Sequence, residues 1–187
     1  MKQVLTPSFW KQRLMDVPNE DHLHFSVLTC PKEDWHTLHR MHLTIIHKHI
    51  NVTEDKVLDL GCGYGRIAKY INNYTGADLS PDLLNIAKKQ NPDKTFVECD
   101  GRSLPFEDNE FNWTVIISLK TMIIENCGEE LWNQIKQEIK RVSSKCLMLE
   151  YGDLFPETSG RVRNSKFVPS YEIMDQNNTT KYGIQFK

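Results

Sequence analysis

VLDLGCGYGRIA, at residues 57–68, joins a short apolar run that carries an acid to a loop with glycine at every second position. This order predicts a β-strand, a tight turn and the start of a helix over 66–72. Glycine lets a ligand approach the backbone closely, and the first N–H groups of a helix suit a polar or anionic ligand. A dinucleotide-binding fingerprint would need glycine where Arg66 stands. A strand–turn–helix that binds nothing is the alternative interpretation.

Asp78 ends the next predicted strand and follows Gly61 by 17 positions. In nucleotide-binding α/β folds an acid near this place holds the ribose, because a carboxylate can accept hydrogen bonds from both hydroxyls. The chain then begins a helix over 81–90, with Ser80 as N-cap and Pro81 in the first helical position. An ordinary solvated turn acid is the alternative for Asp78.

Two more predicted strands complete the series, one ending in Asp100-Gly101 and one in Ser118. The D-x-G-x-G-x-G loop and these strand ends, in this order, resemble class I S-adenosylmethionine-dependent methyltransferases over residues 57–151. The resemblance implies S-adenosyl-L-methionine as the cofactor, with Asp100 accepting from the adenine amine. The family usually has aspartate where Asn112 stands, and the meaning of this departure is open. The implied cofactor site comprises Asp59, Gly61, Cys62, Gly63, Asp78, Leu79, Asp100, Gly101, Arg102 and Ser118.

Strands and helices alternate along the chain after residue 50, which favours a parallel sheet with helices on both faces. We predict an α/β fold: a Rossmann-like, doubly wound, mostly parallel seven-stranded sheet with a C-terminal antiparallel hairpin and an N-terminal helical lid. A single methyltransferase domain would span 1–187, with the lid over 1–50 and the core over 51–187. The predicted strands are 57–60, 75–78, 95–97, 114–118, 145–151 and two within 166–187 around Asn177-Asn178; the other predicted helices are 7–15, 31–50 and 129–142.

Composition limits the range of partners. The chain has 23 Lys and Arg against 25 Asp and Glu, a net charge of −2, and contains no long basic run, so nucleic acid is an unlikely partner by charge. It contains neither a stretch long enough to span a bilayer nor a signal-peptide core, and its five cysteines are dispersed. These features predict a cytoplasmic protein without a membrane partner, while the oligomeric state is open.

Five histidines crowd the predicted helix 31–50, and His39, His42 and His49 fall on or near its apolar face. A metal site would need a third ligand and supporting groups, which the spacing does not supply. Packing is the favoured interpretation, lining of the cofactor or substrate pocket is the alternative, and no metal is predicted.

Methyl transfer is a direct displacement. The protein must therefore bind and align the cofactor and the acceptor and exclude water from them, and no catalytic residue can be assigned. The Ser118–Met122 segment lacks the Asn/Asp-Pro-Pro-aromatic tetrad of base amino-methyltransferases, and there is no Pro-Cys pair for attack on a pyrimidine. Glu150 could offer a base. The candidate substrate residues are Phe9, Trp10, Arg13, Lys120 and Tyr151.

Three functions remain open at this point. The favoured one is methyl transfer to a nucleophilic N, O or S atom of a small-molecule acceptor. The second is modification of a protein or nucleic-acid group other than a base exocyclic amine or C5. The third is a cofactor-binding module or partner subunit without catalysis.

Overall fold

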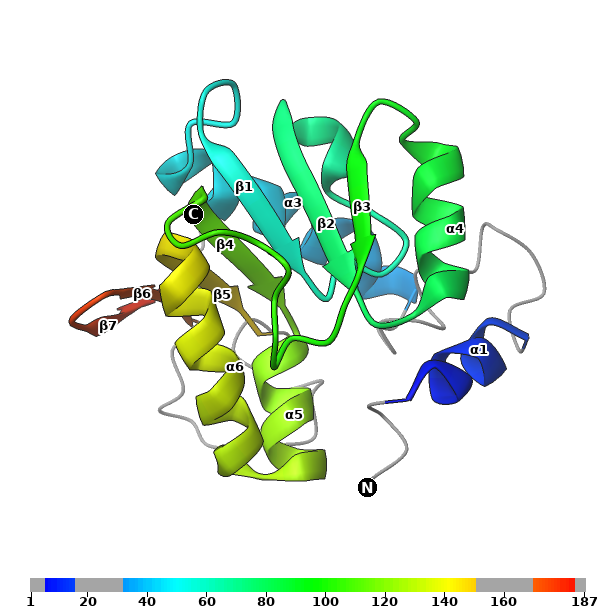
Figure 1. The fold of residues 1–187 in the computed structure, drawn as a ribbon. Coiled ribbons are helices and arrows are strands. Elements are labelled where there is room, and N and C mark those ends of the chain that lie inside the picture. Colours follow the sequence, from blue (N-terminus) through cyan, green and yellow to red (C-terminus); the bar gives the residue numbers. More distant parts are fainter. Residues whose placement is uncertain (1–5, 16–31, 151–169, 184–187) are drawn as a thin grey trace.

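The computed structural model describes residues 6–15, 32–150 and 170–183. Within these ranges the strands form one seven-stranded sheet with the order β3-β2-β1-β4-β5-β6-β7 (Figure 1). Strands β1 to β5 run parallel to one another, whereas β6 is antiparallel to both β5 and β7. The strands are β1 (Lys56–Leu60), β2 (Asn73–Asp78), β3 (Thr95–Glu98), β4 (Phe111–Ile117), β5 (Ser143–Leu149), β6 (Ser170–Asp175) and β7 (Thr179–Gly183). The helices are α1 (Pro7–Met15), α3 (Lys32–His49), the 3₁₀ helix η3 (Ala68–Tyr70), α4 (Pro81–Gln90), α5 (Leu119–Cys127) and α6 (Glu129–Val142).

Helices cover both faces of the sheet, as predicted. Along β1, Val57 packs with α3 and α4 on one face, whereas its neighbour Leu58 packs with α5 and α6 on the other. In β5, Leu147 and Met148 divide between the same two cores. This alternation follows from the period-two geometry of a strand, and burial on both faces accounts for the nearly continuous apolar runs. Helix α3, which the sequence assigned to the lid, contributes Ile46 and other buried residues to the first core.

The C-terminal hairpin is confirmed, with β6 and β7 joined around Asn177-Asn178. Asp175 organises this turn, because its Oδ1 accepts from the backbone N–H groups of both asparagines at 2.8 Å. The start of α4 is confirmed as well: Ser80 is the N-cap and accepts from the Leu83 N–H, and proline occupies the first helical turn.

The predicted helix over 66–72 is wrong. Only η3 forms there, and it is three residues long. Gly65 adopts a φ of +75°, which a right-handed helix does not accommodate, and β2 already begins at Asn73. The turn therefore uses most of the chain between the two strands, and the glycine loop is followed by no helix N-terminus of useful length.

Helix α5 was not predicted. Its first residues follow Ser118, which has a φ of +57° and makes no side-chain cap. The acceptors for its first N–H groups come instead from Glu150, 30 residues further along the chain. Strand β5 correspondingly ends at Leu149, two residues before the predicted end.

Asn112 has a structural explanation. Its Oδ1 accepts a hydrogen bond of 2.7 Å from the Lys56 backbone N–H, which fixes the start of β1 against β4. An amide oxygen serves this contact as well as a carboxylate would. The contact lies at the opposite end of β1 from the glycine loop, so the missing charge does not affect the candidate site.

We predict that Gly76→Ala destabilises the fold. A methyl group at Gly76 would lie 2.7 Å from Phe96 Cδ1 and 2.8 Å from Cys62 Sγ. Such overpacking typically costs about 1–3 kcal/mol, or roughly 2–12 °C in Tm for a domain of this size. Thermal unfolding checks this. Gly101→Ala is the matched control, because its methyl would meet Ile135 at an ordinary 3.6 Å. Equal Tm values for the two variants would contradict the packing argument.

Candidate cofactor site

The glycine loop turns sharply at the end of β1 because three of its residues adopt positive φ. Gly61, Gly63 and Gly65 have φ values of +77°, +55° and +75°, which residues with a Cβ rarely adopt. The N–H groups of Gly61 and Cys62 both donate to the carbonyl oxygen of Ala77, so the loop is fastened to the end of β2. The loop thereby brings the carboxyl ends of β1 and β2 to one place.

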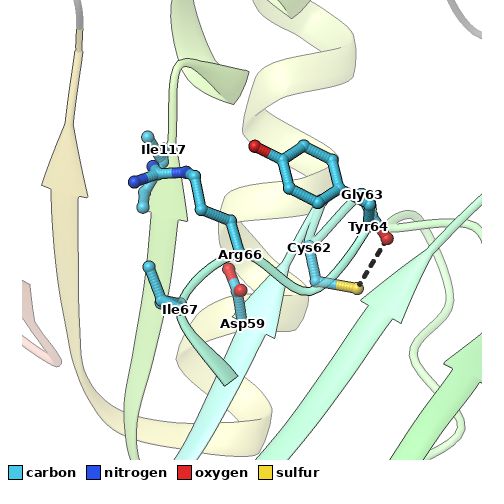
Figure 2. A pocket seen from close by; sticks show the side chains of 8 residues that line it. Asp59, Cys62, Gly63, Tyr64, Arg66, Ile67 and Ile117 are labelled. Carbon is cyan, nitrogen blue, oxygen red and sulfur yellow. Dashed lines mark hydrogen bonds between the residues drawn. The ribbon is translucent and has the colours of Figure 1, made fainter. Parts of the chain in front are cut away.

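A pocket lies inside this loop and reaches the end of β4 (Figure 2). Figure 2 shows Asp59 between Ile67 and Cys62, with Arg66 extending toward Ile117. Among the residues implied by the family resemblance, the pocket brings together Asp59 and the first part of the loop. Its lining consists of Asp59, Gly61, Cys62, Gly63, Tyr64, Arg66, Ile67 and Ile117.

Asp78 lies where the sequence predicted, at the end of β2, but it is not a solvated turn acid. Its Oδ2 accepts from the Gly63 N–H at 2.8 Å and its Oδ1 accepts from the Ser80 N–H at 2.9 Å. Burial raises the pKa of Asp78, and these backbone donors partly oppose that shift. The carboxylate therefore braces the glycine loop from the position expected to hold the ribose.

Asp59 is a buried carboxylate in the pocket lining, 4% exposed. The Tyr74 hydroxyl donates to its Oδ2 at 2.7 Å, and Tyr74 is itself buried. Burial raises the pKa of Asp59 to about 6, while the Tyr74 hydrogen bond and the charge of Arg66 act in the opposite direction. The protonation state of the Asp59 carboxyl therefore changes at a pH near 6.

Asp100 follows β3, and its carboxylate forms an ion pair with Arg102. The Arg102 Nε donates to both carboxylate oxygens, at 3.0 and 2.9 Å, and Nη2 pairs with Oδ2. This hydrogen bonding lowers the pKa of Asp100. The side chains of both residues are nearly half exposed, so the pair can open at little cost when another donor approaches Asp100.

Of the remaining residues of the implied cofactor site, Leu79 and Gly101 do not line the pocket, whereas Cys62 does. Leu79 follows Asp78 and is half-buried, and Gly101 follows Asp100 with ordinary space for a methyl group. Cys62 does line the pocket, but burial raises the pKa of its thiol well above the usual value. A protonated, buried thiol argues against a redox or nucleophilic role.

The histidine-rich helix α3 reaches the pocket through Arg66. Arg66 Nη1 donates to His39 Nδ1 at 2.8 Å, and Arg66 Nη2 donates to His42 Nδ1 at 3.0 Å. The Arg66 guanidinium also lies 5.1 Å from the centroid of the Trp35 ring. Burial and the positive charge of Arg66 lower the pKa of His42 well below the usual value. His49 contacts Tyr171 instead. No group of three potential metal ligands occurs among the residues described here.

The edge beyond β4 and β5 carries the predicted acceptor residues. Ser118 follows β4 and precedes α5 in a left-handed conformation, and its N–H donates to the Leu149 carbonyl. Lys120 forms a 2.6 Å ion pair with Glu172 of β6. Glu150 is buried and accepts from the first N–H groups of α5, at 3.1 and 3.3 Å, and burial raises its pKa to about 7. Its contacts indicate that it holds α5 in place.

The predicted substrate residues of α1 lie beside the glycine loop and α4. Helix α1 is placed beside α4 (Figure 1), and Trp10 packs with Tyr64 of the glycine loop and Leu83 of α4. Phe9 contacts the Trp10 ring edge-on and Arg13 lies over the Phe9 ring. The structure thus links α1 to the glycine loop. Tyr151 lies outside the described residues.

Sequence reasoning missed three polar residues that support the loop. Tyr74 holds Asp59, Arg66 joins the loop to α3, and Asn91 Nδ2 donates to the Gly65 carbonyl at 3.4 Å. Tyr74 follows two asparagines and Asn91 follows the polar run 88–90, so no local pattern marks either residue or names its partner.

Comparisons with known proteins relate the chain to methyltransferases. Residues 57–145 match a family described as a methyltransferase domain. The phthiotriol/phenolphthiotriol dimycocerosates methyltransferase of Mycobacterium leprae is 28% identical over 128 residues, which cover 63% of this chain and 45% of that protein. The chain thus spans about half the length of the curated relatives that it matches.

Two solved structures share the fold. The PH0226 protein of Pyrococcus horikoshii OT3 has a TM-score of 0.55 at 19% identity, covering 82% of this chain and 76% of that one. A SAM-dependent methyltransferase of Methanosarcina mazei has a TM-score of 0.53 at 22% identity, covering 63% and 61%. At these identities the likeness concerns the fold alone. In the part of the chain that the structure describes, none of the helices is long and apolar enough to cross a membrane.

Proposed function

We propose that this chain, whose residues 57–145 match a methyltransferase domain family, binds S-adenosylmethionine and transfers its methyl group to a small-molecule acceptor. The observation that carries the proposal is the placement of Asp59, Asp78 and Asp100 at the carboxyl ends of β1, β2 and β3 around one glycine loop. In a parallel α/β sheet this edge is where ligands bind.

The order of these acids matches the order of groups in the cofactor. Asp100 would accept from the adenine amine after Arg102 moves, Asp78 would hold the ribose hydroxyls, and the amino-acid end would then run toward β1 and the pocket beside Asp59. The bound sulfonium would supply the transferable methyl group. The chain's own residues bind, orient and exclude water around it.

The acceptor would approach from the edge formed by Ser118 and Lys120, and catalysis needs no base if the acceptor is a neutral amine or a thiolate. The Mycobacterium leprae relative is named for methylation of phthiotriol and phenolphthiotriol dimycocerosates, which favours a small-molecule acceptor over a macromolecule here. An unbiased metabolite screen with methyl-labelled cofactor identifies the acceptor by its mass change. Label on a protein or nucleic acid would favour the second candidate function, and binding without turnover the third.

We expect S-adenosylmethionine and its demethylated product, S-adenosylhomocysteine, to stabilise the fold. At a ligand concentration 100 times the dissociation constant, linkage gives about 2.7 kcal/mol. For a chain of this length that is an increase in Tm of roughly 5–10 °C. Thermal unfolding with each ligand and with a nicotinamide dinucleotide is the measurement. A shift with the dinucleotide alone would overturn the cofactor assignment.

A further inference from the structure

Tyr74 is a buried phenol that the cofactor assignment leaves unexplained. It stands on β2 on the same sheet face as Asp59 of β1, and its hydroxyl donates to Asp59 Oδ2 at 2.7 Å. Both side chains are 4% exposed. A buried carboxylate in an apolar core is costly unless donors stabilise it, and this hydroxyl both orients the Asp59 carboxylate and favours its ionised form.

We propose that Tyr74 is a positioning residue that holds Asp59 as the anionic partner of the cofactor's ammonium group, and so sets the pH range over which the cofactor binds. The proposal rests on the proposed function. Asp78 and Asp100 take the adenosine end, and β1 is the next strand in the sheet, so the amino-acid end is the part that reaches Asp59. Asp59 is the carboxylate that lines the pocket there.

Other charged groups around Asp59 bear on the same titration. Arg66 favours the ionised form, and Asp78 disfavours it. The Cys62 thiol stays protonated because burial raises its pKa, and the neutral form of His42 is favoured by burial beside Arg66. Tyr74 adds a directed hydrogen bond, and burial raises its own pKa well above the usual value, so it remains a donor.

Tyr74→Phe removes that donor, together with the hydrogen bond between the same hydroxyl and the Cys62 thiol. Hydrogen bonds to charged groups correspond to about one to two pKa units, so the pKa of Asp59 should rise from about 6 by at least one unit. Because the ammonium pairs with the ionised carboxylate, a rise of one unit should lower the affinity for S-adenosylhomocysteine about fivefold at pH 6, about twofold at pH 7 and negligibly at pH 8, and a larger rise should lower it further at each pH. A purely structural defect would lower the affinity by the same factor at every pH.

Isothermal titration calorimetry with S-adenosylhomocysteine at pH 6, 7 and 8 measures the ratio of the parent's affinity to that of Tyr74→Phe at each pH. 5′-Methylthioadenosine, which lacks the amino-acid part, should bind the parent and Tyr74→Phe equally at each pH. Tyr171→Phe is the matched control, since it removes a buried phenol that contacts His49 of α3 from β6. It should change neither affinity nor pH dependence.

Asp59→Asn provides a second route if Tyr74→Phe fails to fold. Its affinity for S-adenosylhomocysteine should be low at every pH. It should not decrease between pH 8 and pH 6 as the affinity of the parent protein does. A pH-independent ratio for Tyr74→Phe, or an equal effect on 5′-methylthioadenosine, would overturn the role of Tyr74 while leaving the proposed function intact. Failure of both ligands to bind the parent protein would overturn the proposed function itself.

Discussion

Asp78→Ala is expected to weaken S-adenosylhomocysteine binding by about 10- to 150-fold, the loss that follows from removing hydrogen bonds to a charged group. Calorimetric titration measures the affinity directly. The structure adds a second reason for the loss, because the same carboxylate accepts from Gly63 and Ser80 and braces the glycine loop. Alanine therefore removes the expected ribose contact and a loop contact together.

An analogue of S-adenosylhomocysteine without the two ribose hydroxyls separates these effects. The parent protein should discriminate strongly against this analogue, and Asp78→Ala should bind both ligands almost equally. Asp78→Asn should fall between, since one acceptor oxygen survives. Retained discrimination in Asp78→Ala would show that Asp78 serves only the loop, and unchanged affinity for the parent ligand would remove it from the site altogether.

The acids of the site were predictable because each follows a short apolar run, and parallel strands end at a common edge. Asp59, Asp78 and Asp100 could therefore be placed together without any tertiary information. What surrounds each acid was not predictable. Tyr74 precedes Asp78 by only four residues yet bonds to Asp59, because the parallel register brings β2 alongside β1.

Two of the features that the prediction missed have a common physical origin, since the deciding partner lies far away in sequence. Helix α5 lacks a local cap and relies on Glu150. The histidines of α3 were correctly placed on its inner face, but their partner Arg66 belongs to the glycine loop. The segment after Gly65 has a helical pattern but too few residues before β2. A local sequence pattern reveals the propensity of a segment to form a helix, but not whether the chain between two strands is long enough to hold that helix.

Removing residues 1–15 is expected to abolish methyl transfer, with a loss of about 100-fold or more, while the core remains folded and retains measurable cofactor affinity. Helix α1 contains no fully buried residue, so its removal exposes little of either core. It packs through Trp10 against Tyr64, which lines the cofactor pocket, and its loss would open that side of the loop to water. Water weakens electrostatic contacts in a site and permits side reactions.

Transfer of label from S-adenosylmethionine to the acceptor found in the metabolite screen measures this loss, and calorimetry with S-adenosylhomocysteine measures retained affinity. Two point variants make the experiment specific to the observed contact. Trp10→Ala removes the side chain that packs on the loop and should reproduce most of the loss, whereas Met15→Ala alters a residue of the same helix that is 72% exposed and should have no effect. A truncated protein that methylates at nearly the parental rate would show that α1 is not the lid.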